Sequence, residues 1–304
     1  MHKIALVGAN GHLGPHILKA LLNVEDFKVS VLTRASSKSK YPDSVKVLQT
    51  DDDLPYDQLV EVLRGEDALV LAFSGSQKDN SIKLANAAFE AGIKHLIPAD
   101  FGSCDSADSE ALAMLSLFRL KKEVREHLIE LSNKSRPDGT SLSFTAIVTG
   151  HFLDYGLEHG LFGIDTKQKT VRIFDEGTQK FAATSLSDIG LATARVLQRA
   201  DEPRLRNKLV YIQSVQTSQN EMVAVIEQLT GSKLTAVTAN SKDYIVGNKK
   251  LLEENPGDAE ITEQLVTVGG IVGTNWDTKG SSYVNDVIQL PQRDLKTIIQ
   301  NVLQ

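Results

Sequence analysis

The chain has 304 residues, of which 33 are basic and 39 acidic, so its formal net charge is −6. Charged residues at 24% and hydrophobic residues at 41% are ordinary for a globular protein that buries a large core in one extended domain or two closely joined ones. The acidic balance, with no basic cluster, argues against a nucleic-acid partner. The single cysteine, Cys104, excludes an internal disulfide and a multi-cysteine metal site.

The ends and apolar runs of the sequence bear on where the protein works. The first predicted strand has begun by residue 3, which leaves no room for a cleavable targeting segment. No apolar run approaches the length that spans a membrane. We therefore expect a cytoplasmic protein without metal, membrane or nucleic-acid partner. We also expect it to be a monomer or homodimer.

A glycine-rich turn near the N-terminus separates a predicted strand, residues 4–7, from a predicted helix that begins at Pro15. Gly8 suits a tight turn, Gly11 lets a pyrophosphate approach the backbone, and Gly14 lets the helix pack on the strand. The N-terminus of that helix attracts a diphosphate. An ordinary tight turn is the alternative, but the flanks favour dinucleotide binding by Gly8, Asn10, Gly11, His12, Leu13 and Gly14.

The end of the second predicted strand, residues 28–33, indicates which dinucleotide is bound. In such folds this point faces the adenosine ribose, and an acidic residue here would bind the hydroxyls of NAD. The chain instead has Arg34, followed by Ser36, Ser37 and Lys38. A guanidinium suits a 2′-phosphate, so we expect NADPH bound through Arg34, Ser36 and Lys38. A solvated basic loop is the alternative.

Three further strands complete the predicted sheet: residues 45–50, 68–73 and 95–100. Helices are predicted between them at residues 56–64 and 80–91, the latter ending at Gly92. Five strand–helix repeats in about a hundred residues predict an α/β fold with a doubly wound parallel sheet of the Rossmann type.

Several residues that follow these strands are expected to face the cofactor. Asp51 could reach the adenine amine or belong to a polar loop before the next helix, and we leave both open. The turn after the fourth strand should pass beneath the nicotinamide ribose. The fifth strand leads directly into Phe101-Gly102-Ser103. The cofactor contacts assigned here are Ser74, Gly75, Gln77, Asp100 and Phe101.

A long helix is predicted over residues 109–131. Helical spacing gives it one apolar face, formed by Leu117, Val124, Leu128 and Leu131. Lys121 lies on that face, whereas Lys122 is turned about 100° away, toward water. A lysine in an apolar stripe is usually a side chain that extends its amine to solvent. Its place after the fifth strand of a nicotinamide-binding fold makes Lys121 a candidate for contact with the cofactor.

The second half of the chain follows a sixth strand, residues 143–149. Gly150, His151 and Phe152 leave that strand at the carboxyl edge of the sheet, where ligands bind, so they and residues 150–165 should shape a substrate pocket. We therefore divide the chain into an NADP-binding domain, 1–150, and a mainly substrate-binding α/β region, 151–304, whose segment 184–214 returns to the first domain.

Other elements expected in that region are short strands at residues 171–174, 180–183 and 208–212, and a helix at 220–229 ended by Gly231. Another helix opens at residues 184–190, in which Asp188 is a first-turn acid rather than a catalyst. The remainder reads as helix and loop. Gly269-Gly270 should break one helix there, and Pro291 lies near the start of the last.

The usual catalytic pair of short-chain dehydrogenases, Tyr-x-x-x-Lys, is missing. None of the six tyrosines has a lysine four residues later, and neither a HExxH nor a GxSxG motif replaces the pair. Sugar epimerase and ordinary alcohol dehydrogenase activities are therefore disfavoured.

The motifs together resemble the atypical branch of short-chain dehydrogenases that holds the NmrA-like proteins and the isoflavone, pinoresinol–lariciresinol and phenylcoumaran benzylic ether reductases. The matching features are Gly8-x-x-Gly11-x-x-Gly14, Arg34, the run from Gly92 to Pro98, Asp100-Phe101-Gly102, Lys121-x-x-Val124, Thr149-Gly150-x-Phe152 and Asp188-Ile189-Gly190. Family members often have Pro-Ser-Glu-Phe-Gly where this chain has Pro98-Ala99-Asp100-Phe101-Gly102. The substrate-loop region is closer in character to fungal isoflavone-reductase-like proteins than to the plant enzymes.

The resemblance implies a catalytic role for the helix lysine, which is Lys121 here. We expect an NADPH-dependent reductase of a small, mostly apolar molecule of phenolic, enone or benzylic ether type. Desolvation would lower the pKa of Lys121 and suit it to donate or relay a proton. His151 is a second candidate donor, although a histidine in the pocket wall is the favoured interpretation. The alternative function is a non-catalytic NmrA-like regulator that senses dinucleotides and acts through protein partners.

Overall fold

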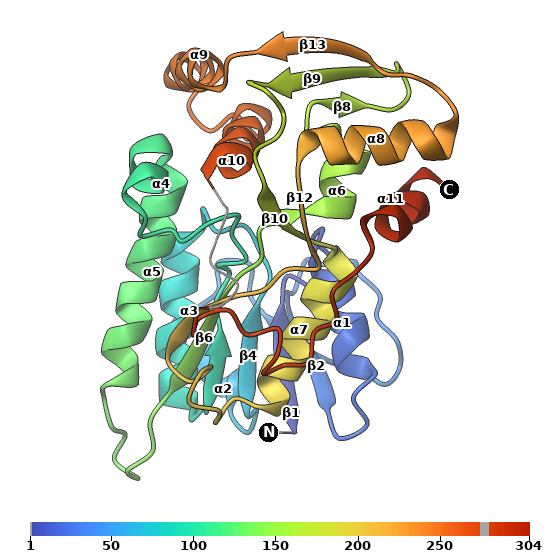
Figure 1. The fold of residues 1–304 in the computed structure, drawn as a ribbon. Coiled ribbons are helices and arrows are strands. Elements are labelled where there is room, and N and C mark those ends of the chain that lie inside the picture. The colour runs from blue at the N-terminus through green and yellow to red at the C-terminus, as the bar shows by residue number, and fades with distance from the viewer. Residues whose placement is uncertain (1, 274–279) are drawn as a thin grey trace.

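The computed structural model describes residues 2–273 and 280–304. A seven-stranded sheet with the order β11-β6-β5-β4-β1-β2-β3 forms its base (Figure 1). Every neighbouring pair in this sheet is parallel. The strands are β1 (Lys3–Val7), β2 (Lys28–Arg34), β3 (Lys46–Thr50), β4 (Ala68–Leu71), β5 (His95–Ile97), β6 (Ser143–Val148) and β11 (Lys208–Tyr211).

Helices cover both faces of this sheet, as the sequence predicts. On one face lie α1 (Gly14–Leu22) and α7 (Leu186–Gln198), whose apolar side chains share a core cluster with β1 and β2. On the other lie α2 (Tyr56–Leu63), α3 (Lys78–Ala91) and α5 (Ser116–Ser132), which form a second cluster. The doubly wound α/β fold is therefore confirmed. Gly92 ends α3 in the left-handed conformation, at φ +87°.

The rest of the chain forms a smaller region above the carboxyl ends of the main strands (Figure 1). Two three-stranded sheets, β12-β10-β7 and β13-β9-β8, enclose a separate apolar core with their helices. The strands are β7 (His151–Phe152), β8 (Ile164–Asp165), β9 (Thr170–Phe174), β10 (Phe181–Thr184), β12 (Val215–Thr217) and β13 (Thr235–Ala239). The helices are α6 (Leu153–Glu158), α8 (Gln219–Thr230), α9 (Ser241–Glu254), α10 (Ala259–Gly273) and α11 (Leu295–Leu303).

The prediction of one continuous helix over residues 109–131 is wrong. The segment forms a short helix, α4 (Ser109–Met114), and then α5, with Leu115 between them in an extended conformation, φ −143° and ψ 140°. Leu115 is buried in an apolar cluster with Phe118 and Leu265 of α10. Packing against a distant helix therefore overrides the local helical preference. The break also changes the buried face, because Phe118 replaces Leu117 as a fully buried residue.

Two expectations for the C-terminal part are also wrong. Gly269 and Gly270 do not break a helix but lie within α10. A Cβ on Gly269 would overlap the Met114 thioether, and a Cβ on Gly270 would overlap the His151 ring, so both glycines serve close packing. In addition, β13 runs beside β9 where helix and loop were expected. Most of its residues are exposed, so it lacks the alternating apolar pattern that marks a strand.

Asp188 lies in the first turn of α7, as predicted, but it also anchors the C-terminal segment. Its side chain is almost fully buried and accepts hydrogen bonds from Ser214 Oγ at 2.6 Å and Arg293 Nη2 at 2.8 Å. Arg293 directly precedes Asp294, the residue that caps α11. The ion pair therefore links the segment before α11 to α7, which packs on the main sheet.

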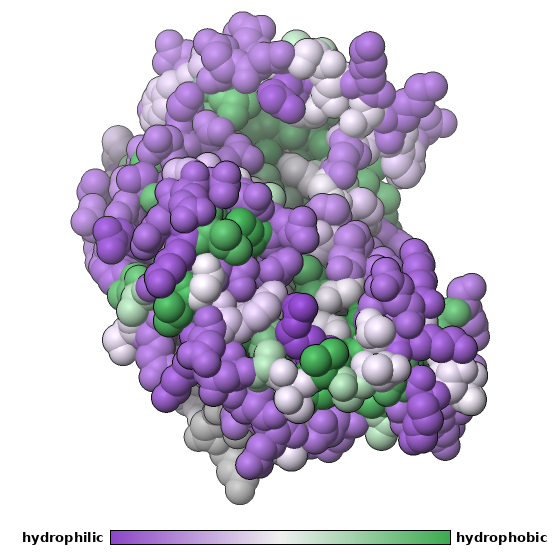
Figure 2. All heavy atoms as spheres, turned by 90° about the horizontal axis from the view of Figure 1, so that it is seen from above, coloured by the Kyte–Doolittle hydropathy of each residue, from purple (hydrophilic) through white to green (hydrophobic). Residues whose placement is uncertain are grey.

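The surface seen from above is mostly hydrophilic (Figure 2). A hollow indents the right-hand edge of this view, and apolar side chains are visible near it. Within residues 2–273 and 280–304, no helix is both long and apolar enough to cross a membrane.

A buried histidine at the start of β5 makes stability depend on pH. His95 lies within hydrogen-bond distance of Ser143 and Thr145, and burial, with a smaller effect of Arg206, lowers its pKa to about 3. The unfolded chain takes up this proton below about pH 6.5, whereas the folded protein does not. The contribution of His95 to the free energy of unfolding is therefore fully present above pH 6.5 and is lost as the pH drops toward 3.

We expect the free energy of unfolding to fall by roughly 1.4 kcal/mol for this histidine between pH 7.5 and 5.5. Urea unfolding at the two pH values measures the loss. His95→Gln should remove about that amount of the pH dependence, whereas His2→Gln, at an exposed histidine, should not. Equal pH dependence in all three proteins would contradict the assignment.

Candidate active site

The glycine turn between β1 and α1 has the geometry that its spacing predicts. Gly8 is at φ +85°, and a Cβ there would lie 2.6 Å from the carbonyl oxygen of Ala72. A Cβ on Gly14 would overlap the Gly8 carbonyl oxygen, so α1 approaches the turn as closely as a glycine allows. Gly11 differs, because it is exposed and a Cβ would meet nothing closer than 3.5 Å. The space above Gly11 is therefore open to a ligand.

The N-terminus of α1 fits a dinucleotide. Leu13 occupies its N-cap position without a side-chain hydrogen bond to the first turn, so the free N–H groups remain available to an anion. Around it, Asn10 donates to Tyr41 Oη at 2.6 Å, and the His12 ring lies 4.7 Å from the Tyr155 ring of α6. The turn thus offers a positive, sterically open cradle whose rim touches both parts of the molecule.

At the end of β2, Arg34 is exposed, as are Ser36 and Lys38 behind it. Asp52 accepts a hydrogen bond from the Ser36 backbone at 3.1 Å, and the bonds from Ser36, helped by the Arg34 charge, lower the pKa of Asp52. Asp51 exchanges two hydrogen bonds with Gln58 of α2, at 2.7 and 2.9 Å. This position is the one expected for a polar loop before α2, and the adenine contact of Asp51 stays a prediction.

The turn after β4 and the segment after β5 meet at the carboxyl edge of the sheet. Ser74 and Gln77 are exposed, and Gln77 lies at the N-cap of α3. Phe101 is buried in the cluster that also contains Ala9 and Leu13, next to the glycine turn. These residues lie at the edge of the sheet where the sequence places the nicotinamide, and their cofactor contacts stay predictions.

Lys121 crosses from α5 to this edge. Its Nζ donates to the Asp100 backbone carbonyl, and a Cβ on Gly75 would overlap its Cε. Burial lowers the pKa of the amine, while the Asp100 carboxylate acts in the opposite direction. Lys122 is about one-third exposed and pairs with Glu126 on the next turn. The two neighbouring lysines therefore have different environments, as the helical spacing predicts.

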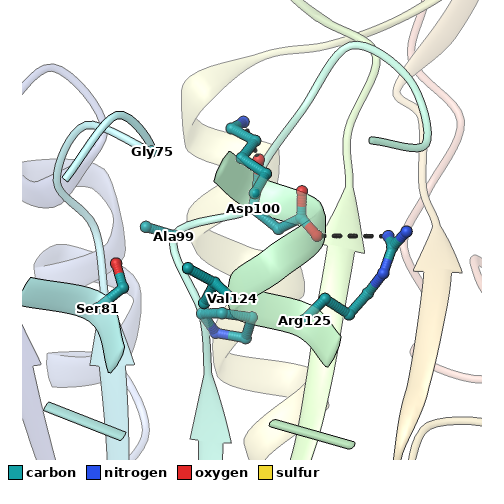
Figure 3. A pocket seen from close by; sticks show the side chains of 8 residues that line it. Gly75, Ser81, Ala99, Asp100, Val124 and Arg125 are labelled. Atoms are coloured by element: carbon teal, nitrogen blue, oxygen red, sulfur yellow. Dashed lines mark hydrogen bonds and ion pairs between the residues drawn. The ribbon is translucent and has the colours of Figure 1, made fainter. Parts of the chain in front are cut away.

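A small pocket lies beside Lys121, between α3, α5 and the end of β5 (Figure 3). The Asp100 carboxylate lines it and is almost fully buried, with Arg125 Nη1 at 3.6 Å from Oδ2. Arg125 Nη2 binds Asp105 Oδ1 at 2.6 Å. No sequence pattern singled out Arg125 or Asp105. The available signal was the position of Arg125 four residues after Lys121, on the same helix face.

His151, in β7, is buried in the core of the smaller region. Its ring contacts Phe162 and Phe181 edge to face, with centroids 5.5 and 5.3 Å away, and its Nε2 faces Gly270. Burial lowers the pKa of His151 to about 4, so it is neutral at pH 7. Gly150 before it is at φ +67°, and Phe152 after it is partly buried. This environment is that of a buried histidine packed among aromatic rings, and its place in the wall of a substrate pocket stays a prediction.

Comparison with known proteins identifies the family. A family model for NmrA-like proteins matches residues 1–266. The chain belongs to this family. The oxidoreductase aprR of Aspergillus flavus is 31% identical over 315 residues, which cover 99% of this chain and 99% of the relative.

Solved structures share the fold over nearly the whole chain. AtPrR2 with NADP+ and (+)pinoresinol has a TM-score of 0.76 at 20% identity, covering 99% of this chain and 98% of that one. The leucoanthocyanidin reductase–NADPH complex from Vitis vinifera also has a TM-score of 0.76, at 17% identity, covering 99% and 100%. The resemblance that the motifs indicated is thus confirmed, including the smaller C-terminal region.

Proposed function

We propose that this NmrA-like protein is an NADPH-dependent reductase of a small, mostly apolar molecule of phenolic, enone or benzylic ether type. The observation that carries the proposal is Lys121, a partly buried amine held on the Asp100 carbonyl beside Gly75 at the carboxyl edge of the sheet. The name of the 31% identical relative, an oxidoreductase, supports the reaction class. AtPrR2 and leucoanthocyanidin reductase support the cofactor and the aromatic character of the substrate.

The cofactor is held by groups of the first domain. The open space above Gly11 and the uncapped N-terminus of α1 receive the diphosphate. Arg34 and Lys38 receive the 2′-phosphate, with Ser36 between them in a loop fastened by Asp52. When bound, NADPH supplies a hydride from the nicotinamide ring.

The protein supplies the proton. Lys121 carries an ammonium whose pKa is lowered by burial, which brings its acidity closer to working pH. The amine lies on a backbone carbonyl, which holds it in place without removing its charge. His151 is neutral and packed against two phenylalanine rings, so it leaves proton donation to Lys121. Gly150, His151 and Phe152 are proposed to contribute to the substrate site.

Arg34→Ala is expected to weaken NADPH binding about tenfold to a hundredfold, because a charge-assisted phosphate contact contributes about 1.5–3 kcal/mol. NADH has no 2′-phosphate, so its affinity should change little and serves as the internal control. Isothermal titration calorimetry with both cofactors measures the difference. Equal losses for the two would show that Arg34 does not bind the 2′-phosphate.

NADPH oxidation, followed against a panel of enones, quinones and phenylpropanoid ethers, tests the reaction. Turnover of at least one compound is the expected result. Micromolar NADPH binding without turnover of any compound would favour the alternative, a dinucleotide sensor that acts through protein partners.

A further inference from the structure

The Asp100 side chain is a buried acid to which the proposed reaction gives no role. Its relative exposure is 3%, and neither carboxylate oxygen has a hydrogen-bond partner among the residues that the structure describes. Burial raises the pKa of Asp100 and the Asp105 charge adds to the rise, while the charges of Lys121 and Arg125 oppose it. A buried carboxylate without hydrogen bonds is costly, so its compensation must come from these cations.

The charges around Asp100 alternate in sign. Lys121 donates to the Asp100 carbonyl oxygen, and only Cα and Cβ separate the carbonyl carbon from the carboxyl carbon. On the other side lies Arg125, and beyond it Asp105 (Figure 3 shows the Asp100–Arg125 pair). The order of charges is therefore ammonium, carboxylate, guanidinium, carboxylate.

Other ionisable groups near Lys121 do not replace this carboxylate. Burial raises the pKa of Cys104, in the loop after β5, to about 11, so the thiol is neutral at pH 7. On the side of α3, Lys78 and Glu123 pair with each other at 2.8 Å and are partly exposed. Asp100 thus provides the buried carboxylate whose charge acts on the amine.

We propose that the Asp100 carboxylate is a positioning residue that keeps the Lys121 amine charged and seated, while Arg125, which Asp105 holds in place, keeps that carboxylate ionised. The proposal deepens the proposed function, because it rests on Lys121 as the proton donor. Burial alone would strip the amine of the proton that it must deliver. A fixed carboxylate next to the amine offsets part of that effect without touching the substrate.

Asp100→Asn tests this role, because it removes the charge and keeps the backbone carbonyl. The readout is the titration midpoint of Lys121 in the full chain, with and without NADPH. It is measured by NMR on protein carrying ¹³C at lysine Cε, with the signal assigned by its loss in Lys121→Arg. We expect the midpoint to fall by about one pH unit or more. Glu123→Gln, which removes an exposed carboxylate from the same helix, should shift it far less.

The outcomes separate this proposal from the proposed function. An unchanged Lys121 midpoint in Asp100→Asn overturns the role of the carboxylate, whatever the activity. A lowered midpoint supports it, and the alkaline limb of kcat should then move to lower pH by the same amount. A lowered midpoint with an unmoved limb keeps the role of Asp100 and contradicts Lys121 as donor. If the asparagine amide, placed against Arg125, prevents folding, Asp100→Ser removes the same charge with a smaller group.

Discussion

Replacing Lys121 with methionine is expected to lower kcat about 10²- to 10⁴-fold, the usual contribution of a general acid or base. Methionine keeps the length and apolar character of the chain that crosses Gly75 and removes only the amine. NADPH affinity should stay nearly unchanged, because the phosphate-binding groups lie on the glycine turn and at the end of β2. Steady-state kinetics on the compound found in the panel, with calorimetry for the cofactor, measures both quantities.

Lys122→Met is the matched control. Lys122 is the adjacent residue of α5, but it pairs with Glu126 at the surface, so its loss should change kcat little. Undiminished turnover in Lys121→Met, or a larger loss in Lys122→Met, would show that the assignment is wrong. The proton would then come from His151 or from ordered water.

Gly11→Val is expected to abolish dinucleotide binding in a protein that still folds. The structure distinguishes this glycine from its neighbours, because Gly8 and Gly14 are packed against backbone whereas Gly11 borders open space. A Cβ there meets no protein atom closer than 3.5 Å, so we expect the valine side chain to occupy the volume of the pyrophosphate instead. Calorimetric titration with NADPH measures binding, and circular dichroism checks the fold.

Gly247→Val provides the control for a new β-branched side chain. Gly247 lies in α9, far along the chain from the turn, and a Cβ there would meet nothing within 4 Å beyond its own stretch of helix. This variant should bind NADPH normally. Near-normal affinity in Gly11→Val as well would contradict the dinucleotide site and, with it, the reductase.

The sequence predicted those parts of the fold whose local signals agree with their packing. The β1–Gly8–α1 unit and the end of α3 at Gly92 are set by backbone requirements that only glycine meets easily. Parallel central strands such as β4 are buried along their whole length, so a continuous apolar run marks them. The helical spacing of apolar residues is another local signal, and it placed Lys121 and Lys122 on different sides of one helix.

The failures occurred where distant contacts decide local structure. Leu115 is extended because it fills an apolar cluster with α10, and nothing in its own neighbourhood interrupts the helical pattern. Gly270 permits close approach of His151, a reason that is invisible without the fold. Asp105 was missed because it lies in a loop, where no periodicity marks its ion pair with Arg125, and Arg125 was missed although it lies four residues after Lys121 on the same helix face.

The position of β11 at the edge of the main sheet has a consequence for how the chain acquires its structure during synthesis. β6 is buried along its whole length and pairs with β11, which emerges from the ribosome only after residues 149–207. Until then one edge of β6 is unpaired, and α1 lacks the apolar cover of α7. Exposed edges and apolar faces favour aggregation of nascent chains. The main sheet and its helical cover are therefore complete only after α7 and β11 have been synthesised. The predicted cofactor-binding domain ends at residue 150, but the segment that must be present for it to fold extends to β11.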